Sequence, residues 1–228
     1  MSRTGFERQS AAARAKGRQV LSRPEVLAAA ARLLDESGIE GLSMRALARS
    51  LGTGPATLYW HVRDRDELLT AVLDETLSHI DVPMDGPWQD RLVLLAERMR
   101  TALLPRPALI EVLWHRDWQL GPVTLGLADA TVGLVAESGL PDDDVADAYL
   151  AVLWFILGFV YAESQAAANT GFPPQAGTGD EPPRYPNLVR YSPDTDRAAM
   201  HRRFVAGLRQ LLTGIEARTH QTDRKALS

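Results

Sequence analysis

Apolar residues recur at three- and four-residue spacing along most of this chain, and no segment shows the strict alternation of a half-buried strand. Glycine and proline interrupt this helical pattern at intervals, and there is no internal repeat or heptad array. We therefore expect an all-α fold. The chain has 228 residues, 45% of them hydrophobic, which is enough for a small helical domain and a larger one.

The composition narrows the class of protein. The absence of cysteine excludes a disulfide framework and a thiolate metal site. The longest apolar run, Tyr149–Ala162, is shorter than the ~20 residues that cross a bilayer. The N-terminus lacks the apolar core of a signal peptide. We therefore expect a cytoplasmic protein that makes no membrane contact.

Charge is distributed unevenly along the chain. The net charge is −4, but residues 1–67 carry 11 Lys and Arg against 8 Asp and Glu, while the remainder carries 14 against 21. A basic N-terminal part suits contact with phosphate, although chance is the alternative explanation of this split. Residues 1–21 form a basic arm that either lies along DNA or is a disordered end.

Start and stop signals divide residues 22–80 into short helices. Ser22–Glu25 is a capping box, and Gly38 is expected to end the first helix in the left-handed conformation. Ser43 caps the second helix, and Asp64–Glu67 is expected to form another capping box. The four expected helices span 23–38, 44–51, 55–61 and 65–80.

A proline- and glycine-containing segment at 83–87 marks the boundary with a second helical domain, expected over 87–218. Segment 169–195 is rich in proline, glycine and charge and is expected to be a long mobile loop, and 219–228 is a tail. The helices expected in this domain span 88–104, 108–115, 123–138, 142–168 and 196–217.

Residues 43–61 have the pattern of a helix, a sharp glycine-containing turn and a second helix. Two short helices braced in this way leave the second one exposed, so that its N-terminus can enter a major groove. Pro55 leaves that N-terminus available to a phosphate, and Arg45 is long enough to reach a guanine edge. Tyr59 and Trp60 point about 100° apart on a helix, so packing is an alternative role for both.

The run GIEGLSMRALARSLGTGPATLYWHVRDRDELL, Gly38–Leu69, closely resembles the DNA-binding domain of the tetracycline-repressor-like (TetR) family. The resemblance covers 22–80 and continues more weakly beyond it, at Trp88–Asp90, Phe155–Gly158 and Phe204–Leu212. It implies a homeodomain-like three-helix helix-turn-helix domain, followed by a helical domain that binds a ligand and forms a dimer.

The resemblance also implies which residues contact DNA. Arg65 is expected to hold a phosphate, and small residues in the turn face the groove, so sequence specificity is expected to rest on few side chains and on DNA shape. The full set of expected DNA contacts is Arg45, Thr53, Gly54, Ala56, Thr57, Tyr59, Trp60, His61 and Arg65.

In this family the C-terminal domain holds a ligand pocket, and the helix at 142–168 and the final helix form a four-helix bundle with their copies. Pockets are lined mainly by apolar and aromatic side chains, although such residues at helical spacing equally form an ordinary core. The candidate pocket residues are Trp88, Leu95, Met99, Leu103, Trp114, Trp118, Phe155, Phe159 and Tyr161.

Tetracycline itself is not the expected ligand. Ile80-Asp81 stands where tetracycline-binding members have a histidine, Leu95 replaces an asparagine, and Ala162 aligns with a metal-linked glutamate, although Glu163 is adjacent. His115 is a ligand or metal contact or, alternatively, makes an ordinary hydrogen bond. A small apolar or aromatic effector fits the lining better, and no metal or cofactor is expected.

We therefore expect a homodimeric, ligand-responsive repressor that is released from operator DNA by its effector. An enzyme is disfavoured because the chain has no nucleophile elbow, zinc-binding His-Glu-x-x-His, P-loop or dinucleotide-binding glycine pattern. The remaining alternative is a DNA-binding regulator that activates transcription or acts without an effector.

Overall fold

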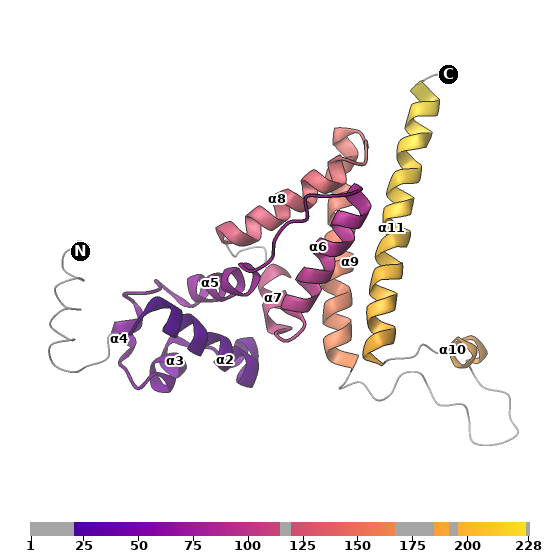
Figure 1. The fold of residues 1–228 in the computed structure, drawn as a ribbon. Coiled ribbons are helices and arrows are strands. Elements are labelled where there is room, and N and C mark those ends of the chain that lie inside the picture. Colours follow the sequence, from indigo (N-terminus) through magenta and orange to yellow (C-terminus); the bar gives the residue numbers. More distant parts are fainter. Residues whose placement is uncertain (1–20, 115–119, 167–184, 192–195, 227–228) are drawn as a thin grey trace, which may run out of the picture.

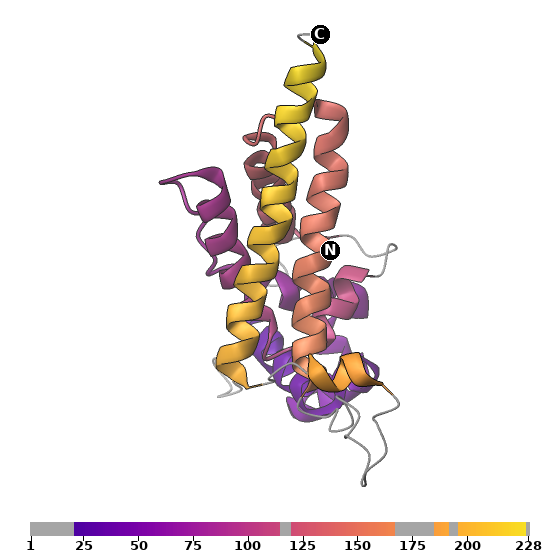
Figure 2. The same cartoon turned by 90° about the vertical axis from the view of Figure 1, so that its right-hand side faces the viewer.

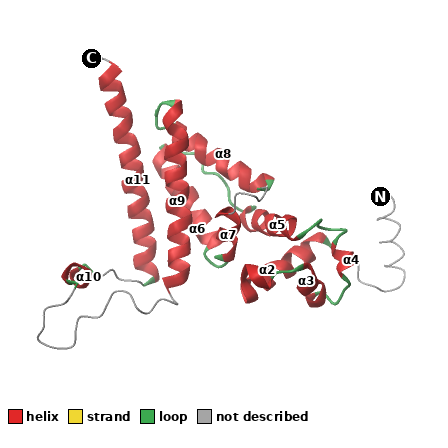
Figure 3. Cartoon of the chain, turned by 180° about the vertical axis from the view of Figure 1, so that it is seen from behind, coloured by secondary structure: helices red, strands yellow, loops and turns green. Residues whose placement is uncertain are grey.

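The structure is a computed structural model that describes residues 21–114, 120–166, 185–191 and 196–226. All regular secondary structure in these ranges is helical, which confirms the all-α prediction (Figures 1 and 3). The helices form a smaller head, from α2 to α5, and a larger body, from α6 to α11. The basic arm before Leu21, His115, Trp118 and most of the expected loop lie outside the described residues.

The head contains four helices with well-defined ends. At the start of α2, the Glu25 carboxylate accepts a hydrogen bond from the Ser22 amide at 2.8 Å and the Ser22 hydroxyl accepts one from the Glu25 amide, so the predicted capping box is present. Gly38 has the predicted positive φ, 65°, but the helix resumes after it. The helices are α2 (Arg23–Gly41), α3 (Met44–Ser50), α4 (Pro55–Leu58) and α5 (Arg65–Leu77).

Three predictions for the head are wrong in detail. Helix α4 ends at Leu58 rather than His61, because the next backbone forms a turn in which the His61 amide donates to the Leu58 carbonyl at 2.8 Å. The second capping box is half formed. The Asp64 carboxylate accepts from the Glu67 amide, but the Glu67 carboxylate binds Arg63 instead of the cap backbone. Helix α5 ends at Leu77, before the expected end at Ile80.

In the body, two long helices, α9 and α11, lie side by side along one face (Figure 2). Helices α6 and α8 pack against α9 from the other side, and α11 also packs on α6. Leu92, Leu95, Ile156 and Phe204 are buried in the core between them. The helices of the body are α6 (Trp88–Leu103), α7 (Ala108–Trp114), α8 (Pro122–Ala136), α9 (Asp142–Ala166), α10 (Pro186–Arg190) and α11 (Arg197–Ala226).

Two features of the body differ from the prediction. A short helix, α10, lies within the segment expected to be a loop, because Pro186 in its first turn favours a helical start. The final helix continues to Ala226 instead of ending at Ala217. Residues 218–226 contain neither proline nor glycine, so nothing in the local sequence stops the helix.

Two polar contacts join the head to the body, in addition to the packing of α5 on α6, α7 and α8. Arg106 Nε donates to Asp35 Oδ1 of α2 at 3.0 Å. The Asp74 carboxylate of α5 accepts hydrogen bonds from the first turn of α8: from the Thr124 amide at 3.0 Å, the Thr124 hydroxyl at 2.7 Å and the Val123 amide at 3.2 Å. Asp74, a residue of the head, therefore caps the N-terminus of α8, a helix of the body.

Helix α9 exposes much of its apolar surface. Within the described ranges, Asp142–Gln165 is the only helix whose length and mean hydropathy, 1.9, match a membrane span, and 33% of its most apolar window is buried in the single chain. Core helices of water-soluble proteins pass the same test. Trp154 of α9 is 54% exposed. The exposed face of α9 therefore needs a covering partner in water.

Candidate functional site

Helices α3 and α4 form the predicted helix-turn-helix. The Ser43 hydroxyl accepts a hydrogen bond from the Ala46 amide at 3.1 Å, which starts α3. Gly52 adopts a φ of 61° in the turn, a conformation that favours glycine. Leu47 and Leu58 are fully buried against the head, so α4 is fixed by its inner side and lies at the outer end of the molecule (Figures 1 and 3).

The outer side of this motif carries most of the predicted DNA contacts. Arg45, Gly54 and Ala56 are exposed, and Thr53, Thr57 and His61 are partly exposed. Tyr59 and Trp60 are 55% and 46% exposed, which argues against the alternative that both are packing residues. The head thus presents two large aromatic side chains and several small polar ones to solvent on one short segment.

Arg65 differs from the prediction of a phosphate contact. Its Nε donates to the Leu42 carbonyl at 2.7 Å, and its Nη2 donates to the Ile39 carbonyl. These carbonyls belong to the end of α2, where backbone acceptors lack helical partners. Arg65 therefore fastens the end of α2 to the start of α5, and two of its three nitrogens, Nε and Nη2, are occupied within the head.

Arg23 and Arg63 are two cations beside the motif that the sequence analysis missed. Arg23 Nη1 donates to the His61 carbonyl, and Arg63 Nε donates to Glu67 Oε2 at 2.8 Å. Partial burial, and then the charge of Arg23, lower the pKa of His61. Hydrogen bonds from the backbone and side chain of Arg63 hold the pKa of Glu67 below its ordinary value. The signal available in the sequence was the closeness of Arg63 to α4. Arg23 is brought to the motif only by folding.

The predicted pocket residues do not share one environment. Leu95 and Leu103 are fully buried in the core, whereas Trp114 and Tyr161 are largely exposed. Two of the aromatic residues form a cluster with Phe204 of α11. The ring centroid of Phe159 lies 5.3 Å from that of Phe204, and Phe155 lies 5.7 Å from it. Met99 is buried, Trp88 packs against the core, and Trp118 lies outside the described residues.

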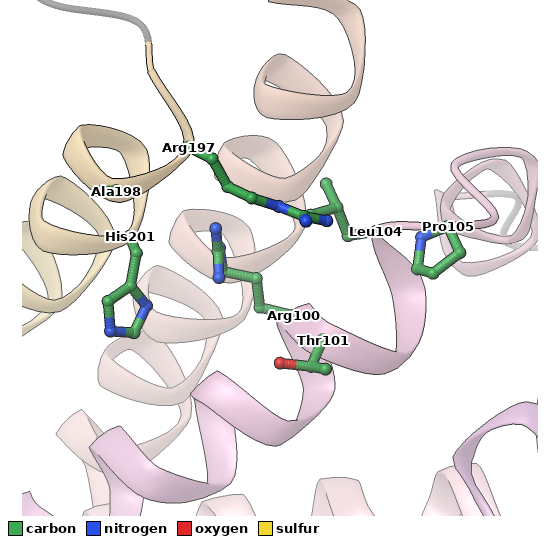
Figure 4. A pocket seen from close by; sticks show the side chains of 7 residues that line it. All are labelled: Arg100, Thr101, Leu104, Pro105, Arg197, Ala198 and His201. Atoms are coloured by element: carbon green, nitrogen blue, oxygen red, sulfur yellow. The ribbon is translucent and has the colours of Figure 1, made fainter.

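A cavity of about 660 Å³ lies between α6 and α11 (Figure 4). Its lining differs from the predicted set of pocket residues. A second cavity of about 450 Å³ adjoins it and shares Arg100, Thr101 and His201 with it. Of the predicted pocket residues that the structure describes, none lines either cavity. The residues that line the larger cavity are Arg100, Thr101, Leu104, Pro105, Arg197, Ala198 and His201.

A buried ion pair underlies this cavity. Arg100 Nε donates to Glu163 Oε2 at 2.7 Å, and Arg100 Nη2 donates to Glu163 Oε1. The two side chains are 8% and 7% exposed. The guanidinium carbon of Arg100 also lies 5.6 Å from the centroid of the Phe204 ring. The pair therefore holds α6 to α9 and fixes the Arg100 side chain in one position.

Known proteins match both parts of the chain. Residues 26–72 match the model of the bacterial regulatory proteins, tetR family, and residues 82–219 match the tetracyclin repressor-like C-terminal domain. The class A tetracycline repressor from transposon 1721 of Escherichia coli is 31% identical over 198 residues, which cover 85% of this chain and 89% of that repressor.

Solved structures agree with these matches. Apo ActR from Streptomyces coelicolor has a TM-score of 0.71 at 28% identity, covering 89% of this chain and 98% of that one. BioQ, solved with its double-stranded DNA operator, has a TM-score of 0.63 at 27% identity, covering 86% of this chain and 99% of that one.

Proposed function

Because the chain belongs to the TetR family, whose members are DNA-binding regulators and not enzymes, we propose that it is a repressor that a small apolar or aromatic effector releases from its operator. The observation that carries this proposal is the exposed outer side of α4 and of the turn after it, where Tyr59 and Trp60 are about half exposed beside small residues that permit close approach to DNA. We also propose that it acts in the cytoplasm.

The contacts follow from the placement of these side chains. The N-terminus of α4 at Pro55 enters the major groove, where Thr57 and Arg45 contact bases or phosphates. Tyr59 and His61 contact the phosphate backbone, and Trp60 covers the edge of the groove. Thr53, Gly54 and Ala56 have little hydrogen-bonding capacity, so DNA shape contributes to the choice of operator.

The active form is a homodimer. The exposed apolar face of α9 lies beside α11, and both helices run along the same side of the body (Figure 2). Pairing of α9 and α11 with their copies covers this face in a four-helix bundle. A twofold dimer then presents two recognition helices about 34 Å apart, one turn of DNA.

Release is a change between two states. Effector binding in the body favours a state in which α5 tilts, and α5 carries the head with it because it packs on α6, α7 and α8. A roughly 100-fold loss of operator affinity requires about 2.7 kcal/mol of differential effector binding. The aromatic cluster of Phe155, Phe159 and Phe204 supports an apolar or aromatic effector.

A gel-shift titration with the DNA upstream of the protein's own gene tests DNA binding. We expect Arg45→Ala to reduce affinity about tenfold or more, because it removes a base or phosphate contact. Arg32→Ala is the matched control, since Arg32 is an exposed arginine of the same head on α2, one turn from the junction residue Asp35. Failure of the wild-type protein to shift any upstream fragment at low salt contradicts the proposal.

The second candidate, a regulator that activates transcription or needs no effector, is separated by two further measurements. A repressor increases transcription of its target when its gene is deleted, whereas an activator decreases it. An inducible regulator shows both thermal stabilisation by its effector and loss of the gel shift at the same concentration. Stabilisation without loss of the shift favours the second candidate.

A further inference from the structure

The larger cavity between α6 and α11 has a basic lining. Among the described residues that line it, the ionisable ones are Arg100, Arg197 and His201, and none of these described residues is acidic. Figure 4 shows Arg100 entering the space from α6, while Arg197 and His201 enter it from α11. Like charges brought toward one space repel each other, and an anion between them removes that repulsion.

Arg100 is an anchored donor. Its Nε and Nη2 are occupied by Glu163, but Nη1, with two N–H groups, makes no hydrogen bond to the described part of the protein. The residue is 7% exposed and lies on the cavity wall. A donor whose side chain is held in place by an ion pair loses little freedom on binding, which favours a charge-assisted hydrogen bond to a ligand oxygen.

Arg197 supplies a charge that no described residue neutralises, and His201 lies beside it. Arg197 is exposed and makes no ion pair or hydrogen bond within the described ranges. His201 Nε2 lies 3.3 Å from Glu97 Oε1, which borders the second cavity, and its ring still faces the first. Arg197 is therefore the principal unpaired cation of the site.

The rest of the lining is apolar, apart from the hydroxyl of Thr101. Leu104, Pro105 and Ala198 form a wall beside the cations. A volume of about 660 Å³ lies within the usual range of small-molecule sites. We propose that this cavity binds a small organic oxyanion, a carboxylate or a phosphate monoester, whose charged group lies between Arg197 and Arg100 and whose apolar body lies on this wall.

The inference deepens the proposed function, since it assigns a charged group and a position to the effector, but binding itself is measurable without DNA. The sequence analysis placed the effector among other residues and expected it to be apolar or aromatic. An oxyanion with an apolar body still agrees with the expected apolar effector, and its negative charge suits the basic lining.

Isothermal titration calorimetry on the full-length protein tests binding. The probes are 4-phenylbutyrate and phenyl phosphate, with neutral 4-phenylbutan-1-ol as their comparison. We expect at least one anion to bind about tenfold more tightly than the alcohol. Equal affinity for the anions and the alcohol, or no saturable anion binding up to about 10 mM, overturns the proposal.

Variants locate the site. Arg197→Gln should weaken anion binding about fivefold or more and leave the binding of the alcohol unchanged. Arg202→Gln is the matched control, because Arg202 is an exposed arginine on the same helix that does not line the cavity. Arg197 is exposed and unpaired, so its variant should fold normally, as thermal melting checks. An Arg197→Gln protein that binds the anions like wild type overturns the proposal.

A gel shift with the same probes separates this inference from the proposed function. Anion binding that depends on Arg197 but leaves the DNA complex intact supports the oxyanion site and contradicts its role as effector site. Release of DNA by the neutral alcohol, with no anion binding, supports the proposed effector response and overturns the oxyanion site.

Discussion

Tyr59 and Trp60 show how a single residue acquires its role from its neighbours. Leu58 and Val62, on either side of them, fill the core of the head and are buried to within 2% exposure. The two aromatic residues between them are left about half exposed on the outside of the head. Exposed aromatic side chains with a polar group are instead suited to contact with a nucleic acid backbone.

Tyr59→Phe should weaken operator binding about fivefold, because it removes one hydroxyl hydrogen bond to phosphate, worth about 1 kcal/mol. The free energy of unfolding should change by less than about 0.5 kcal/mol, since the ring stays in place. Fluorescence anisotropy with labelled operator measures the affinity. Tyr191→Phe, at an exposed tyrosine directly after α10, is the control, and equal affinities of the two variants would argue against a phosphate contact.

His61 gives the head a pH-dependent stability. Its pKa in the folded protein lies below the ordinary value of 6.5, so the unfolded chain takes up the proton more readily. This contribution to stability is fully present above pH 6.5 and is lost as the pH falls below that value towards the pKa of the folded state. Glu67, whose pKa is lowered, acts only in a more acidic window, below 4.5.

His61→Gln should therefore show a smaller loss of stability than the wild type between about pH 7.5 and 5.5. Urea denaturation at the two pH values measures the difference in unfolding free energy. His79→Gln, at an exposed histidine after the end of α5, is the control. A wild-type slope in His61→Gln would show that another group is responsible.

Among the helices, the contact between α5 and α8 joins the head to the body, where we propose that the effector binds. Asp74 closes the N-terminus of α8, where amide donors have no helical partners and the helix dipole favours a negative charge. A tilt of α5 in the proposed release step must either carry α8 with it or break these three hydrogen bonds. This makes Asp74 the polar link through which the two movements are coupled.

Asp74→Ala should lower the free energy of unfolding by about 2 kcal/mol, because it removes a cap and leaves partly buried donors unpaired. Asp74→Asn keeps one acceptor oxygen and should lose less. Glu75→Ala, at the exposed neighbouring position, should stay within about 0.5 kcal/mol of wild type. Urea denaturation compares the three, and equal losses in Asp74→Ala and Glu75→Ala would contradict the capping role.

At the scale of the whole molecule, we expect the exposed apolar face of α9 to determine the assembly. Trp154→Glu places a charge on this face and should convert the dimer to monomers, because a buried unpaired charge outweighs the apolar area regained on pairing. Size-exclusion chromatography with light scattering measures the mass, and DNA affinity should fall with it. Tyr191→Glu is the control at another exposed aromatic residue, and a dimeric Trp154→Glu protein would place the interface elsewhere.

The sequence was sufficient to predict features that depend on local spacing. The order of helices, the cap at Ser22, the turn at Gly52 and the exposed residues of α4 all follow from short-range patterns, and the structure agrees. The exact ends of α4 and α11 do not follow from such patterns. The ends of a four-residue helix are set by tertiary packing, and a polar helix end lacks the apolar periodicity that would reveal its length.

The basic cavity was not predictable in the same way, since Arg100 and His201 lie far apart in sequence and meet only through the packing of α6 on α11. One signal was present. Arg100 interrupts the apolar face of its helix, one turn after Ala96 and one turn before Leu103, a position where a charged side chain requires a partner. The sequence could not name Glu163 as that partner.

Because Gly121 lies close to Asp74, substitutions at these two positions should be coupled in evolution. The Cβ of a side chain at 121 would lie 2.1 Å from Asp74 Oδ2, so the carboxylate would have to move away from the hydrogen bonds that it accepts. Replacement of Asp74 by a small residue would open that space, and position 121 could then accept a side chain without this shift. Among descendants of this chain, the two substitutions should arise together or in that order.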